Sequence, residues 1–413
     1  MRKLLLASIT VLAPAAAHAG GYNLPNANAR TLALSQSDLA DQRGAQALLL
    51  NPAALAGQLG LDFSGNFEWL TNRTDWSDPN LGEASLKFHF NTPIAVALSF
   101  GDRLSNGMQW GVGVGVHTPY GGSLHWPKGW AGQESVQSVD QKVFAITAGA
   151  GFQPVKWLSI GGAYIRYQGS EELHQSVNYV DHYGDAGIAL SGGDDTFMLS
   201  AQIDVPKIPL RIAGSYKHKA IADIDGNAHF EDVPPAFSTL LHDQPVTSNI
   251  KLPSEFHVGA AYALTPRLSV MATFTEELWS IYHDDTFVGS TGFTVTVPRD
   301  YKDAQVYRLG VEWEHVPFLQ ALTLRVGGLR SISPQPSDTV SPSLTDGDSW
   351  AVSAGVGCDV GSSVRIDLGY QHAFFDNVMS SGPETLDGSY DTDVDELSLG
   401  VNIRLDLLGR ASR

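Results

Sequence analysis

From about residue 60 to the C-terminus, apolar and polar residues alternate in segments of roughly ten residues. Successive side chains of a β-strand point to opposite faces, so alternation gives a strand one apolar and one polar face. In the last segment Leu397, Leu399 and Val401 share one parity, whereas Ser398 and Gly400 share the other. The pattern predicts an all-β fold.

The connections between the segments separate two all-β architectures. Short connections are expected at 102–107, 153–155, 205–207, 265–266, 316–319 and 361–362, and they alternate with long ones at 72–83, 119–138, 170–194, 222–249, 283–301, 332–347 and 376–392. A soluble sandwich also alternates, but a membrane barrel has short turns at one rim and long loops at the other. We therefore expect a transmembrane antiparallel β-barrel of about fourteen strands over residues 61–413.

The N-terminus predicts export. Residues 1–19 combine Arg2 and Lys3 with an apolar run and end at Ala17-His18-Ala19, as a signal peptide does before cleavage. No later run of about 18 apolar residues could span a membrane as a helix. We expect a multi-pass barrel in the outer membrane of a Gram-negative cell.

Residues 20–60 lack the alternation and are expected to form a plug. Asn51-Pro52-Ala53 predicts a helix start with Asn51 as N-cap, and Gly57 predicts its end. A barrel of fourteen strands encloses a lumen wider than its own side chains fill. This hatch segment is expected inside the lumen; the alternative is a disordered tail.

Charge excludes one class of partner. The formal net charge is −18, and losing Arg2 and Lys3 would leave −20, which argues against nucleic acid. Acidic residues of the predicted loops are either solvated or bind divalent cations that bridge lipopolysaccharide; they are Asp181, Asp185, Asp194, Asp195, Asp284, Asp285, Asp391, Asp393 and Asp395. The single cysteine, Cys358, forms no internal disulfide and is expected in the barrel wall. No cofactor or metal is expected.

Short motifs occur in order along nearly the whole exported chain. They are Asn51-Pro52-Ala53, Thr118-Pro119-Tyr120-Gly121, Trp126-Pro127, Trp130-Ala131-Gly132, Trp157-Leu158-Ser159-Ile160-Gly161-Gly162, Leu252-Pro253-Ser254, Thr265-Pro266-Arg267-Leu268, Trp279-Ser280, Tyr301-Lys302-Asp303 and Ser341-Pro342-Ser343-Leu344. In this order the chain resembles the FadL-type outer-membrane transporters of long-chain fatty acids and other hydrophobic compounds, including aromatic hydrocarbons.

The resemblance implies a fourteen-stranded barrel plugged by an N-terminal hatch, with a kink in the third strand that opens the wall sideways. It places Asn51, Pro52 and Ala53 in the hatch. Gly111, Gly113 and Gly115, at alternate positions of the third predicted strand, are the candidates for the lateral gate. The alternative is that these glycines only make room for the plug.

The resemblance also implies an external hydrophobic groove built by apolar residues midway through two long loops. They are Leu124, Trp126, Trp130, Tyr179, Tyr183, Ile188 and Leu190. An aromatic belt at the membrane interface is the alternative explanation.

Four cationic side chains of lumen parity are candidate contacts for a substrate carboxylate: Arg211, Lys217, Arg308 and Arg325. The alternative is that they pair with acids such as Glu312 and Asp367 and hold the wall rigid.

The expected function is passive uptake of long-chain fatty acids or similar hydrophobic compounds, which gain roughly 0.8 kcal/mol per buried CH₂ and need no energy source to reach lipid. An aromatic-hydrocarbon importer, a general porin and an outer-membrane lipid hydrolase are the alternatives, although no nucleophile motif is present. The protein is expected to be a monomer in contact with outer-membrane lipid and lipopolysaccharide. A role of its exposed loops as a phage receptor or in adhesion is compatible with transport. The non-aromatic C-terminus leaves its recognition during assembly open.

Overall fold

The computed structural model describes residues 21–24, 28–292, 294–317, 319–380 and 386–406. The predicted signal peptide and the C-terminal tail beyond residue 406 lie outside these residues. Within them, no helix is long and apolar enough to cross a membrane.

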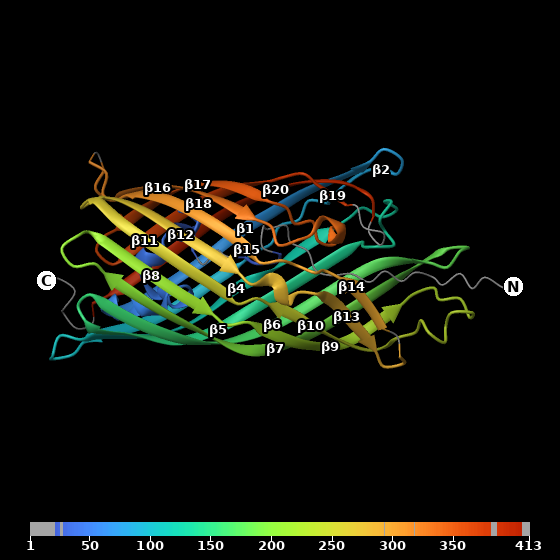
Figure 1. Cartoon of the computed structure of the whole chain (residues 1–413), viewed down its shortest axis with the longest axis horizontal. Coiled ribbons are helices and arrows are strands. Elements are labelled where there is room, and N and C mark those ends of the chain that lie inside the picture. The colour runs from blue at the N-terminus through green and yellow to red at the C-terminus, as the bar shows by residue number, and fades with distance from the viewer. Residues whose placement is uncertain (1–20, 25–27, 293, 318, 381–385, 407–413) are drawn as a thin grey trace.

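The described strands form a single antiparallel sheet that closes on itself (Figure 1). They are β1 (Gly60–Asp78), β2 (Gly82–Ser85), β3 (Ile94–Arg103), β4 (Gln109–His125), β5 (Ser138–Val155), β6 (Leu158–Asn178), β7 (Tyr183–Asp204), β8 (Leu210–Lys217), β9 (Ala220–Phe230), β10 (Gln244–Leu252), β11 (Glu255–Thr265), β12 (Leu268–Glu277), β13 (Asp284–Gly289), β14 (Thr294–Pro298), β15 (Ala304–Trp313), β16 (Leu322–Ile332), β17 (Ser349–Val360), β18 (Val364–Phe375), β19 (Val378–Ser380) and β20 (Gly388–Leu405).

Several of these strands are collinear halves of one longer strand. β2 and β3 both pair with β1, β8 and β9 both pair with β7, and β18 and β19 both pair with β20. The first and last strands close the barrel, in register from Leu61 opposite Leu405 to Ser77 opposite Ser389. The result is a closed barrel of fourteen strands, which confirms the predicted fold class.

The predicted parity is confirmed by burial. The outward positions of β20, among them Leu397 and Leu399, are 39% and 40% exposed, whereas Ser398 between them is fully buried. An apolar band of this kind is what a barrel presents to lipid. Aromatic side chains such as Trp69 and Tyr370 also face outward. Further along the same strands the outward positions become polar.

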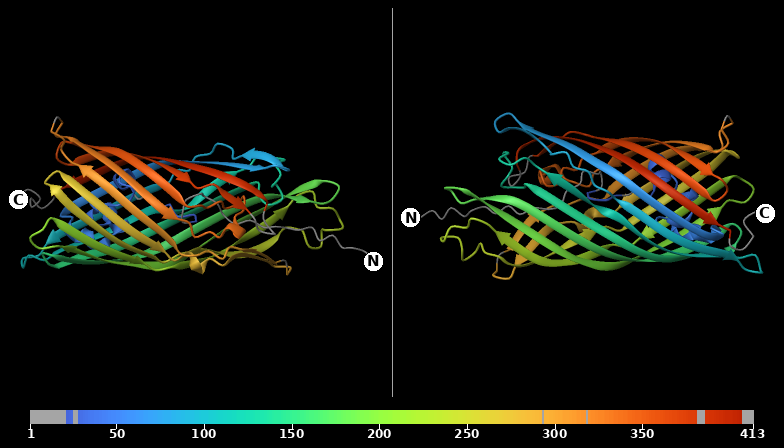
Figure 2. Two further views of the ribbon diagram at one scale, coloured as in Figure 1. Left: turned by 45° about the horizontal axis from the view of Figure 1, so that its top comes forward. Right: turned by 180° about the vertical axis from the view of Figure 1, so that it is seen from behind.

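The two ends of the barrel differ, as predicted. Short turns and the end of β20 lie at one end, here called the turn end, and longer excursions lie at the other, the loop end (Figure 2). The strand ends predicted around the long connections 170–194, 222–249 and 283–301 are wrong, because β6 with β7, β9 with β10, and β13 with β14 continue into these ranges as paired strands. The tips that join β6 to β7 and β9 to β10 project beyond the rest of the loop end (Figure 1).

The hatch segment lies inside the barrel near the turn end (Figure 1). It contains α1 (Ala29–Ala33) and the 3-10 turns η1 (Leu39–Asp41), η2 (Ala45–Leu49) and η3 (Pro52–Gly57). Two further 3-10 turns, η4 (Trp279–Ile281) and η5 (Ser337–Thr339), lie toward the loop end. Nearly every described residue of the hatch segment is buried.

Candidate functional site

The third barrel strand, β4, leaves the regular wall at residues 118–124. Below this point burial alternates, but from Thr118 to Leu124 every residue is buried, so both faces of the strand are covered by protein. The pairing with β5 shifts by one residue between His117 and Tyr120, which marks a β-bulge. Pro119 has no N–H to donate, and Gly121 has φ +147°, so the local sequence favours a bend here.

The neighbouring strand is interrupted at the same level. β3 pairs with β4 only as far as Ala95 opposite His117, and residues 86–93 between β2 and β3 belong to neither strand. The backbone N–H of Lys87 meets the carbonyl of His125 at 2.8 Å above this interval. We call the unpaired interval between residues 86–93 and residues 118–124 the wall break.

Residues 22–24 occupy the inner edge of β4 at the wall break. Asn23 forms a β-bridge with Tyr120, Leu24 N–H donates to the Pro119 carbonyl at 2.7 Å, and Gly121 N–H donates to the Tyr22 carbonyl at 3.0 Å. Unpaired edge groups buried away from water are costly, so these bonds satisfy the edge that β3 leaves free. The N-terminal end of the hatch segment thus substitutes for the missing neighbour strand.

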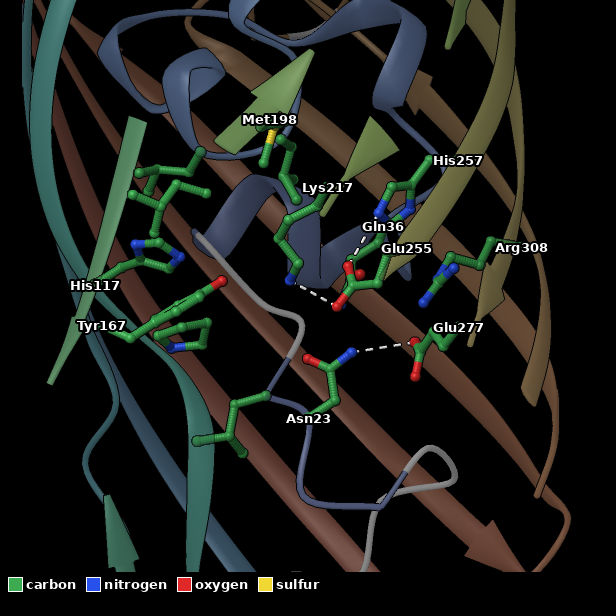
Figure 3. A pocket seen from close by; sticks show the side chains of 15 residues that line it. Asn23, Gln36, His117, Tyr167, Met198, Lys217, Glu255, His257, Glu277 and Arg308 are labelled. Carbon is green, nitrogen blue, oxygen red and sulfur yellow. Dashed lines mark hydrogen bonds and ion pairs between the residues drawn. The ribbon is translucent and has the colours of Figure 1, made fainter. Parts of the chain in front are cut away.

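A cavity in the lumen lies directly behind these residues (Figure 3). Asn23 and Leu24 form one side of it, and strands on the far side contribute Lys217, Glu255 and Glu277. Lys217 Nζ lies 2.6 Å from Glu255 Oε1, and Asn23 Nδ2 donates to Glu277 Oε1 at 3.1 Å. The cavity wall also contains Leu49, Ile165 and Met198, so polar and apolar groups share it.

Of the four cationic side chains predicted to contact a substrate carboxylate, only Arg308 forms no ion pair with a carboxylate of the described residues. In the described part of the chain it forms no ion pair, and its Nε has no hydrogen-bond partner although the side chain is 6% exposed. Its Nη1 donates to the Thr275 hydroxyl. An unsatisfied buried donor costs about 1–3 kcal/mol, so Arg308 at the cavity wall is a place where an acceptor would be stabilised.

The other three predicted cations are paired, which matches the alternative given for them. Lys217 pairs with Glu255, Arg211 with Asp41 and Asp204, and Arg325 with Glu312 and Asp367. Arg325 Nη1 lies 2.8 Å from Asp367 Oδ1, with both side chains buried. Lys217 lines the cavity, whereas Arg211 and Arg325 are absent from its lining.

Ion pairs anchor the base of the hatch segment to the wall. Arg30 lies 2.8 Å from Asp38, 2.7 Å from Asp41 and 2.9 Å from Glu312 of β15, and Arg211 of β8 lies 2.6 Å from Asp41. Burial alone would raise the pKa of the Asp41 carboxyl, but the neighbouring arginines together lower it. Burial keeps the pKa of the Asp38 carboxyl raised despite Arg30. Ion pairs therefore join the base of the hatch segment to both β8 and β15.

Asn51, Pro52 and Ala53 press against the wall. Asn51 is the N-cap residue of η3, as predicted, but its side chain forms no capping hydrogen bond: Nδ2 donates to the Leu39 carbonyl at 3.1 Å and to Gln202 Oε1 of β7 at 3.0 Å. Ala53 N–H donates to the Ser200 hydroxyl at 2.8 Å. These residues dock the hatch segment on the sheet.

We expect Asn51→Ala to loosen this docking by about 1–2 kcal/mol, because two buried hydrogen bonds are lost. The measurement is hydrogen exchange of the hatch amides in purified protein. Exposed Asn80→Ala is the matched control and should leave exchange unchanged. Unaltered exchange in Asn51→Ala would contradict a docking role.

The structure places Gly111, Gly113 and Gly115 below the bend of β4, in its regularly paired part. They face the hatch segment: a Cβ on Gly111 would lie 2.2 Å from the Leu55 carbonyl oxygen, and one on Gly115 would lie 3.4 Å from Leu49. This placement favours the alternative, in which the glycines make room for the plug. Their assignment to a lateral gate stays a prediction.

The predicted groove residues separate into two groups. Leu124, Trp126, Trp130, Ile188 and Leu190 are buried in one apolar cluster, and the rings of Trp126 and Trp130 stack with centroids 4.2 Å apart. Tyr179 and Tyr183 do not belong to this cluster.

Tyr179 and Tyr183 lie near the tips of the projecting strands. Tyr179 packs in a small cluster with Leu241 and Phe237, and Tyr183 is 49% exposed and donates to Glu134. Phe230 packs against both this small cluster and the larger one. The external groove stays a prediction.

Sequence reasoning missed three features of the site: the edge pairing of residues 22–24, the acids Glu255 and Glu277, and the position of the bend. The bend falls in the stretch predicted as the long connection 119–138, because β4 continues through that stretch to His125. Pro119 was the available signal, since proline within a strand is confined to edges and bulges. No group of three His, Cys, Asp or Glu side chains among the described residues is placed to hold a metal ion.

Comparisons with known proteins agree with this architecture. Residues 10–405 match the family model described as "Outer membrane protein transport protein (OMPP1/FadL/TodX)". A Pseudomonas aeruginosa FadL homologue is similar over 93% of this chain and 99% of its own, with a TM-score of 0.81 and 16% identity. No curated protein matches in sequence.

Two transporters of toluene are also similar in structure. The P. putida transporter TodX has a TM-score of 0.70 at 16% identity over 94% of this chain and 99% of its own. The Ralstonia pickettii transporter TbuX has a TM-score of 0.65 at 15% identity over 94% and 99%. At these identities the structural similarity shows the fold alone. The family itself is shown by the match to the family model.

Proposed function

Because the chain belongs to the FadL/TodX family of outer-membrane transport proteins, we propose that it takes up long-chain fatty acids passively and releases them sideways through the wall break. The observation that carries the proposal is the bend of β4 beside the interrupted neighbouring strand, with the lumen cavity directly behind it. The turn end then faces the periplasm, and the loop end faces outward.

The exit path of the substrate depends on how firmly each part of the hatch segment is held in the lumen. The base of the hatch segment is held by buried ion pairs, and breaking such a pair costs about 3–5 kcal/mol. Residues 22–24 form no ion pair with the described residues: they are held by backbone hydrogen bonds to β4, each with a net contribution of about 0.5–1.5 kcal/mol, by the Asn23–Glu277 hydrogen bond and by packing of the Tyr22 ring. Substrate entering the cavity displaces the weaker part, so the free edge of β4 and the wall break become its exit.

Energetics make this route sufficient without an energy source. An acyl chain gains roughly 0.8 kcal/mol for each CH₂ that leaves water, both in an apolar cavity and in lipid. Sideways release keeps the chain out of the aqueous periplasm. The hollow on the periplasmic face of the hatch, here called the periplasmic vestibule, includes the charged side chains of Arg43, Asp62, Arg365 and Arg404, so an acyl chain leaving there would pass charged groups before reaching water.

A carboxylate head group suits Arg308. Its unpartnered Nε at the cavity wall provides a charged donor, and Lys217 stands at the same cavity. The carboxylate can accept from Arg308 while the acyl chain contacts Leu49, Ile165 and Met198.

We expect Arg308→Gln to raise the oleate concentration for half-maximal uptake about tenfold or more, because a hydrogen bond to a charged group contributes about 1.5–3 kcal/mol. The measurement is labelled-oleate uptake by cells that lack their own transporter, at equal surface expression. Arg330→Gln, a partly exposed arginine of β16, is the matched control and should leave uptake unchanged. Equal uptake by all three proteins would remove Arg308 as the carboxylate contact without touching the route.

One observation favours an aromatic hydrocarbon as the second candidate substrate. The Tyr22 ring is surrounded by Trp279, Tyr282 and Tyr120, at centroid distances of 5.0, 6.0 and 6.1 Å. Aromatic rings favour edge-to-face contacts with one another. The space that the Tyr22 ring leaves on displacement therefore suits the ring of an aromatic substrate. Uptake of labelled toluene that Arg308→Gln does not alter, together with no uptake of oleate, would favour this candidate.

A further inference from the structure

A basic rim borders the outer end of the wall break. It consists of Lys87 and His89 from the interrupted strand, His125 from the end of β4 and Lys142 from β5. The rings of His89 and His125 lie 4.9 Å apart, and the Lys87 N–H donates to the His125 carbonyl. Lys142 lies close enough for its charge to act on His89. Three separate segments therefore bring their basic side chains to one place.

Asp140 lies beside the rim and is already engaged by His125, and Glu172 of β6 stands opposite Asp140 in the sheet. Asp140 Oδ2 lies 2.9 Å from His125 Nε2, whereas Lys87 and Lys142 are exposed and form no ion pair within the described residues. In a protein whose formal net charge is −18, two exposed lysines beside two histidines form a local exception. Such a patch attracts anions.

The rim lies at the level where the lipid-facing band ends. Trp69 of β1 and Phe144 of β5 are 39% and 40% exposed on the outer surface. The next strongly polar outward positions on these strands are Arg73 and Lys142. A lysine or arginine just beyond an aromatic residue stands at the head groups of the outer leaflet.

Exposed aromatic side chains accompany the cations. Phe88 and Phe90, in the same interrupted segment as Lys87 and His89, are 78% and 52% exposed. In water two such phenylalanines would be unfavourable, but beside lipid they contact acyl chains. A ligand that fits the rim therefore combines a negatively charged head group with acyl chains.

We propose that the basic rim binds a phosphate of lipopolysaccharide, with an acyl chain of the same molecule against Phe88 and Phe90. Lysine and protonated or neutral imidazole donate to phosphate oxygens, and the outer leaflet supplies this phosphorylated lipid at the height of the rim. The bound lipid stands at the mouth of the wall break. The proposal concerns the outer surface and does not depend on which substrate is transported.

The test is native mass spectrometry of the purified mature barrel with hexa-acylated lipid A that carries two phosphates, and with the same lipid after dephosphorylation. The variant is Lys87→Gln with Lys142→Gln. The matched control is Lys156→Gln with Lys302→Gln: Lys156 is exposed in the turn between β5 and β6, and Lys302 is exposed just before β15. Unchanged heat-modifiability in electrophoresis verifies that each barrel is folded.

We expect the native and control barrels to bind the phosphorylated lipid equally and the rim variant to bind it at least tenfold more weakly. The dephosphorylated lipid should bind all three weakly. Equal binding of phosphorylated lipid A by the rim variant and the native barrel would overturn the proposal, as would equal binding of the two lipids by the native barrel, which indicates apolar adsorption alone.

Discussion

Deleting Pro119 is expected to reduce oleate uptake at least tenfold while the barrel remains folded. Between His117 and Tyr120, β4 carries one residue more than the facing stretch of β5 from Ala145 to Val143. Removing one residue restores one-to-one pairing, so Tyr120 keeps its partner Val143 and the bulge is lost. A straight β4 can pair onward with the neighbouring strand and close the wall break.

Pro119→Ala is the matched control for the deletion, because it keeps the extra residue and therefore the bulge. It should retain most of the uptake, and both variants should show native heat-modifiability. Full uptake by the deletion variant would mean that the bend of β4 is not part of the route. Loss of uptake in both variants would point to Pro119 itself and not to the bulge.

Joining residue 23 to residue 120 by a disulfide is expected to block uptake under oxidising conditions. Asn23 and Tyr120 are β-bridge partners, whose Cα atoms lie about 4.5–5.5 Å apart, within the disulfide range of about 4.4–6.8 Å. In the variant Asn23→Cys with Tyr120→Cys, residues 22–24 cannot leave the edge of β4. Cys358→Ser removes the only native cysteine from this background.

The reduced form of the same variant is the control, since it carries the same substitutions without the tether. We expect uptake to fall at least tenfold on oxidation and to return on reduction, measured in the same cells. Uptake that does not respond to oxidation, with the disulfide verified by mass spectrometry, would contradict the displacement of residues 22–24 and would leave the wall break to be tested separately.

The barrel could be predicted because its sequence signal is local. Alternation of period two assigns Leu397 and Leu399 to one face whatever lies beside them, and closing β1 on β20 needs only the strand count and the common parity. The loops were predicted less well for the same reason. Above the apolar band β6 and β7 continue as strands whose outward face carries Glu172, His174 and Asp185, so the apolar alternation ends there although the strands do not.

The site required information that no local pattern contains. The edge pairing joins residues 22–24 to a strand about a hundred positions later, and it exists because the interrupted β3 leaves that edge unpaired. The pairing of cations is equally long-range: Arg30 meets Glu312 across 282 positions. Sequence parity identified Arg308 and Arg325 as inward, but only the fold distinguishes the paired guanidinium from the unpaired one.

The central claim is that substrate leaves through the wall break into lipid, and cross-linking measures this most directly. A photoreactive amino acid is placed at Phe90 beside the wall break, at lipid-facing Leu368 on β18, or at Ser362 in the periplasmic vestibule, and cells are then supplied with labelled oleate. We predict strong labelling at residue 90 that falls to the level of residue 368 when Pro119 is deleted. Labelling concentrated at residue 362, with residue 90 no stronger than residue 368, would contradict lateral release.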